Sequence, residues 1–153
     1  MRATPLAGRW RELACVVVAA GLVAAAAPAG LAQNTPDPGG WHIPADAVNQ
    51  TNPLAPGDTL LKKGRDVYDH HCATCHGHQG KGDGPSGDEE HPPADLTDPA
   101  RAEANPDGVV FYKVWNGRKS PRMPAFKSRL TKEEVWAVVA YIKTFRTIPQ
   151  ARE

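Results

Sequence analysis

The stretch Cys72-Ala73-Thr74-Cys75-His76-Gly77 decides how this chain of 153 residues is interpreted. Two cysteines three positions apart, followed at once by a histidine, form the attachment motif of c-type haem. On one helical turn the two sulfurs face the same way, so each can bond one vinyl group of the same porphyrin. We therefore predict that Cys72 and Cys75 hold one haem c covalently and that His76 is an axial ligand of its iron.

Two other uses of these residue types compete with haem attachment. A Cys-x-x-Cys pair alone is typical of thioredoxin-like redox proteins, but that site needs a βαβ context, and no strand-rich pattern surrounds Cys72. Structural zinc is the second alternative, because histidines crowd this stretch. Such zinc sites usually need a second ligand pair at a repeated spacing, and no cysteine follows Cys75. Haem attachment is the prediction that these residues favour.

The first 32 residues have the order of a secretory signal peptide. Three arginines precede an apolar run from Cys15 to Ala27, and small residues follow it. We predict cleavage after Ala32 and export to the bacterial periplasm, because covalent haem attachment by this motif normally takes place outside the cytoplasm. The apolar run is short for a membrane-spanning helix. An uncleaved anchor on the periplasmic side of the inner membrane is the alternative.

The charge balance and the glycine pattern exclude two classes of ligand. Residues 1–32 carry three arginines and one glutamate, so the rest of the chain has 15 basic and 16 acidic side chains and a formal charge of −1. No overall basic field remains to suggest nucleic acid. The glycine-rich run 77–84 has neither the preceding strand nor the Gly-Lys-Ser/Thr of a phosphate-binding loop. We expect it to wrap one edge of the haem.

Composition divides the chain into four segments. They are a signal peptide (1–32), a Pro/Gly-rich extended arm (33–57), a helical domain (58–148) and a C-terminal tail (149–153). The arm is either a plain linker or is docked on the domain through Trp41-His42-Ile43-Pro44.

The helical domain begins with a helix that carries the haem motif at its end. Asp58 or Thr59 is expected to cap this helix, whose apolar positions recur at helical spacing. A second helix is expected after the cap Asn105, with Pro106 at its first position and Gly117 past its end.

The last helix is expected to cross the first. Thr131 and Glu134 form a capping box at its start. An apolar stripe follows and needs a partner; it consists of Val135, Val138, Val139, Ile142 and Phe145. Gly64, in the middle of the first helix, would let the two backbones approach closely.

The second axial ligand is predicted in the irregular loop 118–126. Met123 is the only methionine besides the start residue, and Pro121 and Pro124 hold it outside a helical face. A lone methionine is normally a core filler. Its place downstream of the haem motif, between rigid residues, instead favours ligation of the iron.

Four further residues are candidates for contacts around the haem. A carbonyl near Pro85 or Pro92 is expected to accept the Nδ1 proton of His76 and so fix the ring. Trp115 either belongs to the core or donates its indole N–H to a haem propionate. Arg118 is a second candidate for a propionate contact.

Residues Asp58 to Arg146 together resemble a class I c-type cytochrome. The matching features are the haem motif with Gly64 and Tyr68 before it, the glycine loop with Pro92 to Leu96, the segment Met123 to Phe126, and the last helix with Trp136 and Tyr141. The resemblance implies the all-α cytochrome c fold, several helices packed around one covalent haem, with His76 and Met123 as ligands. The arm resembles extensions of mono-haem subunits of respiratory assemblies.

This ligand set predicts a one-electron carrier and not an enzyme. Two protein ligands leave no iron position for oxygen, peroxide or another small-molecule substrate, and a thioether ligand raises the reduction potential. The partners would be redox proteins, and the chain either a soluble shuttle or a mono-haem subunit of a membrane-bound respiratory or dehydrogenase complex. Basic residues around Met123 predict a docking face for an acidic partner; they are Lys113, Arg118, Lys119, Arg122, Lys127, Arg129 and Lys132.

A haem c sensor or a peroxidase-like protein is the alternative function. It would require that Met123 does not bind, which leaves one iron position open. The candidate distal residues are then His42, His70, His71, His78 and His91.

Overall fold

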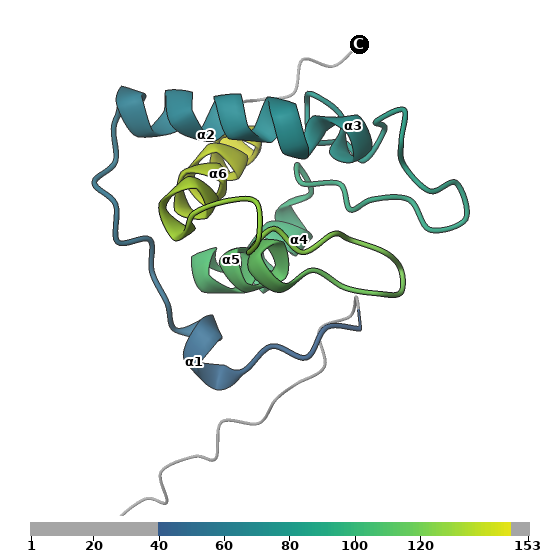
Figure 1. Cartoon of the computed structure of the whole chain (residues 1–153), viewed down its shortest axis with the longest axis horizontal. Coiled ribbons are helices and arrows are strands. Elements are labelled where there is room, and N and C mark those ends of the chain that lie inside the picture. The colour runs from purple at the N-terminus through teal and green to yellow at the C-terminus, as the bar shows by residue number, and fades with distance from the viewer. Residues whose placement is uncertain (1–39, 148–153) are drawn as a thin grey trace, which may run out of the picture. The chain divides into compact units, whose positions relative to one another are not determined.

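Helices account for the regular structure of residues 40–147, the part of the chain that the computed structural model describes (Figure 1). They are α1 (Ala45–Val48), α2 (Asp58–His71), α3 (Ala73–His76), α4 (Pro99–Ala104), α5 (Asp107–Asn116) and α6 (Lys132–Thr147). The predicted all-α fold is confirmed. The predicted signal peptide, the first residues of the arm and the tail 149–153 lie outside the described residues.

The crossing of α2 and α6 forms the centre of the fold (Figure 1). At Gly64 the two backbones are so close that an added Cβ would lie 2.1 Å from the carbonyl oxygen of Ala137. The rings of Tyr68, Tyr141 and Phe145 pack beside this point in edge-to-face pairs, with centroids 5.1 to 5.5 Å apart. The predicted approach of the last helix at Gly64 is confirmed.

The capping box of α6 is also confirmed. The carboxylate of Glu134 accepts hydrogen bonds from the backbone N–H and the hydroxyl of Thr131, each at 2.8 Å, and the Glu134 N–H donates back to that hydroxyl. Leu130 and Val135, on either side of the box, belong to one buried cluster with Phe111, which stacks on Trp136 at 4.3 Å. This cluster holds α5 against α6.

The N-terminal ends of α2 and α5 each differ from the prediction by one residue. Gly57 is the N-cap of α2, so Asp58 is its first helical residue. Pro106 is the N-cap of α5. Asn105 instead ends α4, where its amide donates to the Arg101 carbonyl at 2.6 Å. The predicted end of α5 at Gly117 is confirmed, and that glycine has a φ of 61°.

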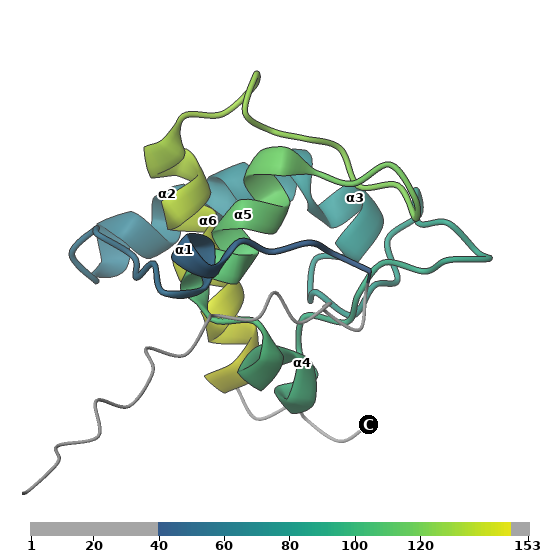
Figure 2. The ribbon, with the colours of Figure 1, turned by 90° about the horizontal axis from the view of Figure 1, so that it is seen from below.

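The described part of the arm is docked on the helical domain. Its residues 45–48 form α1, which lies against α5 (Figure 2). Trp41, Ile43 and Ala47 are buried in a cluster with Val109 of α5. A four-residue helix is too short to show a helical period in the sequence, so only the docking through Trp41 to Pro44 was foreseen as an option.

No helix within residues 40–147 is both long and apolar enough to span a membrane.

Candidate cofactor site

The Cys-x-x-Cys-His motif sits at the junction of α2 and α3. α2 ends at His71, and the N–H of Cys72 still bonds the Tyr68 carbonyl at 2.8 Å. The chain then turns into α3, where the N–H of His76 bonds the Cys72 carbonyl at 2.9 Å. This single turn brings Cys72, Cys75 and His76 onto one short, hydrogen-bonded segment, as the spacing predicted.

Both cysteines are free thiols and half-buried. Burial, together with the nearby Cys75, raises the pKa of the Cys72 thiol to about 12. This direction is opposite to the lowered pKa of the cysteines in reactive redox pairs. The thioredoxin-like alternative gains no support from this environment.

The glycine loop is bound to α3 by three backbone hydrogen bonds. The N–H groups of Gly82, Gly84 and Ser86 donate to the carbonyls of His76, Cys75 and Thr74 at 2.9, 3.1 and 2.7 Å. A Cβ on Gly84 would lie 2.6 Å from the Thr74 carbonyl oxygen, so only glycine permits this approach. The loop thus fixes the backbone of the motif without using side chains.

The ring of His76 is oriented by the carbonyl of Ala94, which lies 3.1 Å from Nδ1. Because a carbonyl can only accept, Nδ1 carries the ring proton and Nε2 keeps the lone pair that a metal ligand needs. Burial lowers the pKa of His76, and the Ala94 hydrogen bond opposes this only in part, so the neutral imidazole is favoured.

The acceptor of the His76 proton is therefore two residues past Pro92, in one of the two predicted neighbourhoods, and not beside Pro85. Pro85 lies between Gly84 and Ser86, whose N–H groups bond the motif backbone instead. Gly82 brings the following segment close, since its added Cβ would lie 2.3 Å from the Pro93 carbonyl oxygen. The path of the loop cannot be inferred from its composition. It places the carbonyl after that of Pro93, which belongs to Ala94, at the His76 ring.

Tyr68 links α2 to the residue that follows the motif. Its hydroxyl donates to the Gly77 carbonyl at 2.8 Å, and its side chain is fully buried. Burial raises the pKa of Tyr68, so the phenol keeps this proton. The sequence marked Tyr68 only as a family feature; its role as a hydrogen-bond donor needed the structure.

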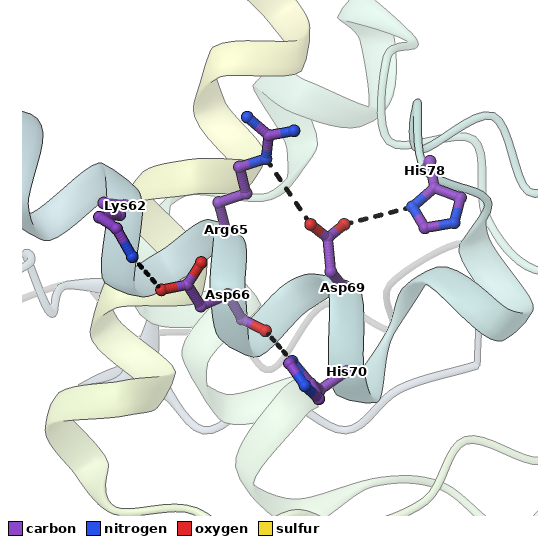
Figure 3. Close-up of polar contacts among 6 residues, drawn as sticks. All are labelled: Lys62, Arg65, Asp66, Asp69, His70 and His78. Carbon is purple, nitrogen blue, oxygen red and sulfur yellow. Dashed lines mark hydrogen bonds and ion pairs between the residues drawn. The ribbon is translucent and has the colours of Figure 1, made fainter.

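Exposed polar contacts continue along the surface of α2 to the residue after Gly77 (Figure 3). The Asp69 carboxylate lies 3.6 Å from Arg65 Nε and 3.3 Å from His78 Nδ1. His70 Nδ1 lies 2.7 Å from the Asp66 carbonyl. Such exposed pairs are each worth about 0–1 kcal/mol, so they support the motif only weakly.

The histidines named for the alternative function are all exposed: they are His42, His70, His71, His78 and His91. Among residues 40–147, no group of three or more His, Cys, Asp or Glu side chains is arranged to hold a metal ion. The geometry of these residues thus gives no support to the zinc alternative.

Met123 is held in a loop that is closed on itself. Arg118 and Met123 exchange backbone hydrogen bonds of 2.8 and 2.9 Å, which form an isolated antiparallel bridge. The N–H of Phe126 bonds the Val114 carbonyl at 3.2 Å, so the loop is also tied to the end of α5. A Cβ on Gly117 would lie 2.6 Å from the Met123 carbonyl oxygen. Met123 itself is half-buried.

Trp115 has the core packing that was one of its two predicted roles, and Arg118 has protein partners that the sequence did not indicate. Trp115 stacks on Phe111 at 5.8 Å and packs against the buried cluster between α5 and α6. Arg118 donates from Nε to the Pro121 carbonyl at 2.9 Å and places its guanidinium over the Trp41 ring. Their contact with a haem propionate stays a prediction.

The family of the chain follows from comparison with known proteins. A family model described as cytochrome c oxidase, cbb3-type, subunit III matches residues 59–142, which is more than half of the chain. The chain belongs to this family. It is a c-type cytochrome, its cofactor is covalently bound haem c, and its class of function is electron transfer.

Two known proteins resemble this cytochrome beyond the family match. The cbb3-type cytochrome c oxidase subunit FixP of Azorhizobium caulinodans is 35% identical over 101 residues, which cover 65% of this chain and 32% of FixP. The chain thus matches about a third of the length of that relative. A solved structure of a reducing HAO-like protein complex of Kuenenia stuttgartiensis shares 26% identity with a TM-score of 0.50, over 64% of this chain and 48% of the other.

The described residues fit haem c. The structure places two free thiols on one hydrogen-bonded turn, which is the donor pair that covalent attachment needs. Beside them it holds a neutral imidazole with Nδ1 engaged by a backbone carbonyl, the usual arrangement of a metal-bound histidine.

Proposed function

We propose that this cytochrome is a periplasmic one-electron carrier whose haem is attached through Cys72 and Cys75 and ligated by His76 and Met123. When bound, the haem supplies an iron that alternates between the ferric and ferrous states. If His76 and Met123 both held the iron, no position would be left on it for a substrate. The protein therefore passes electrons and does not carry out a reaction of its own.

The hydrogen bond between His76 Nδ1 and the Ala94 carbonyl carries this proposal. It fixes the tautomer and the orientation of the ring, which leaves the Nε2 lone pair for the iron. The three loop hydrogen bonds to α3 hold the backbone beneath it. An imidazole in this state is suited to permanent ligation and not to acid-base exchange with a substrate.

Met123 is proposed as the other ligand because its position is fixed twice, by the bridge to Arg118 and by packing of its side chain. A thioether favours ferrous iron more than a second imidazole does, so the potential would be positive. A flexible surface methionine would not serve, because ligation would have to order the loop each time.

A place as a mono-haem subunit of a membrane-bound respiratory complex is favoured over a soluble shuttle. Both similar proteins are described as parts of larger assemblies, an oxidase subunit and a protein complex. The match covers about a third of FixP, so the complex of this cytochrome need not be the same.

The optical spectrum of the ferric protein tests the ligand pair. We expect the long-wavelength charge-transfer band of methionine sulfur on ferric iron, and no binding of carbon monoxide by the reduced protein at neutral pH. Met123→Leu should lose the band and bind carbon monoxide, with the haem still attached. Phe126→Leu, a buried change in the same loop, should keep the band. Ready carbon monoxide binding by the wild-type protein would instead support the sensor or peroxidase-like alternative.

A further inference from the structure

The docked segment of the arm, residues 41–47, meets the loop that holds Met123. We propose that this segment restrains the methionine loop, and that Trp41 is a positioning residue for the axial ligand. The proposal rests on the proposed ligation by Met123. It gives the arm a role in the site itself and not only in assembly with partners.

Side-chain packing provides the first connection. Trp41 and Ile43 are 9% and 7% exposed and form a buried cluster with Ala47 and Val109. Met123 packs against this cluster and also against the larger cluster between α5 and α6. The methionine side chain thus lies where the arm and the helical core meet, and the arm supplies part of the wall around it.

A second connection runs through Arg118. Its guanidinium carbon lies 4.7 Å from the centroid of the Trp41 ring, and Lys113 Nζ lies 5.4 Å from the same ring. Cations over an indole face are attracted by its π electrons. The backbone of Arg118 is in turn paired with Met123 in both directions. Movement of Met123 away from the core would therefore pull Arg118 from the indole.

The segment can restrain the loop because it and the residues that follow it are attached to the helical core. At Gly108 an added Cβ would lie 1.9 Å from the Ala47 carbonyl oxygen, so α1 is in backbone contact with α5. Further on, the amide of Asn52 donates to the Trp136 carbonyl of α6 at 2.9 Å, and Leu54 packs against the core. The arm is thus attached to α5 at Ala47 and to α6 at Asn52.

The consequence is a shift in a conformational equilibrium. A methionine loop that opens exposes the iron to ligands from solution, and the apparent affinity of such a ligand is proportional to the open fraction. Contacts made only in the closed state reduce that fraction. Removing the Trp41 ring should raise the fraction of protein with an open loop, without changing the position of His76.

Imidazole binding to the ferric holoprotein measures the open fraction. We expect Trp41→Ala to bind imidazole about tenfold more tightly than the wild-type protein, which corresponds to about 1.4 kcal/mol, and to weaken the methionine band. Trp41→Phe, which keeps an aromatic face for Arg118, should stay close to wild type. His42→Ala, an exposed neighbour, should not change the affinity.

The variant Phe145→Leu is the control for a general loosening of the fold. Phe145 is 8% exposed and lies in the cluster around Tyr68, which does not include Met123. If Phe145→Leu lowers the melting temperature as much as Trp41→Ala and tightens imidazole equally, the proposal is wrong. It is also wrong if Trp41→Ala binds imidazole with wild-type affinity. A wild-type protein without the methionine band would instead remove the ligation by Met123 on which the proposal rests.

Discussion

Gly64 shows how much of this fold depends on one absent side chain. Its Cα faces the backbone of α6, with the Ala137 carbonyl oxygen 2.1 Å and Tyr141 Cβ 2.9 Å from the position of a Cβ. Backbone atoms cannot move aside as a flexible side chain can. The sequence indicated this contact, because a glycine inside an apolar helix costs about 1 kcal/mol and is retained where another helix must come close.

We predict that Gly64→Val lowers the free energy of unfolding by at least about 3 kcal/mol, because overpacking is most costly where backbone has to shift. Denaturant unfolding of the holoprotein, followed by circular dichroism, measures the change. Gly57→Ser adds a Cβ at the N-cap of the same helix, where nothing lies within 4 Å, and should have little effect. Equal losses in the two variants would contradict the close approach of the helices.

The hydrogen-bond acceptor of His76 could be predicted from the sequence only in part. The motif itself was found because its three reactive side chains are fixed by spacing along one turn. The carbonyl at Nδ1 depends on where a loop of glycines and prolines returns to the motif, and every residue of that loop offers the same acceptor group. Sequence therefore identified the need for a carbonyl near Pro85 or Pro92 but could not choose between them, and the structure has it at Ala94, two residues past Pro92.

Among the elements, the long helices were predicted well and the short ones were not. The apolar stripes of α2, α5 and α6 extend over ten or more residues, so their periods are visible in the sequence. α1 and α4 have four and six residues, too few for a period. Asn105 could cap either α4 or α5, and only its hydrogen bond to Arg101 decides between them.

The capping box of α6 predicts that the stability of this helix depends on pH. Hydrogen bonds from Thr131 hold the pKa of Glu134 below its usual 4.5. Since the folded pKa is the lower one, this stabilisation is complete above the usual pKa and is lost as the pH falls through the folded value. Thr131→Ala should raise the pKa of Glu134 in a carboxyl NMR titration and cost about 1 kcal/mol of stability at neutral pH.

Thr51→Ala, an exposed threonine of the arm, is the matched control for the cap. It should leave the pKa of Glu134 where it is in the wild-type protein. If Thr131→Ala also leaves that pKa unchanged, the hydrogen bonds of the box are not its cause.

At the scale of the whole molecule, surface charge is expected to set the rate of encounter with partners. Arg122 and Lys127 are exposed in the segment around Met123. If this face docks an acidic redox protein, Arg122→Glu with Lys127→Glu should slow electron transfer several-fold at low ionic strength, because long-range attraction mainly affects association. The effect should shrink as salt is added, since the Debye length is about 8 Å at physiological ionic strength.

Stopped-flow kinetics with an acidic partner protein measures this rate. The control Lys62→Glu with Arg101→Glu changes the net charge by the same amount at exposed positions on α2 and α4. If both double variants slow the reaction equally, only net charge matters. An unchanged rate in the first variant would remove the docking face around Met123.

The backbone pairing between the glycine loop and α3 has a consequence for how freely this protein can vary. Alternate amides of the loop, at 82, 84 and 86, meet successive carbonyls of the motif in reverse order, at 76, 75 and 74. The pairing has a fixed spacing and uses backbone groups alone, and the one side-chain condition on it is that glycine stands at 82 and 84. Deleting one residue between 82 and 86 would put the pairing out of step, whereas residues added at the exposed stretch 88–91 would leave it intact. Homologous chains could therefore lengthen this loop to meet different partners while the motif beneath it stays the same.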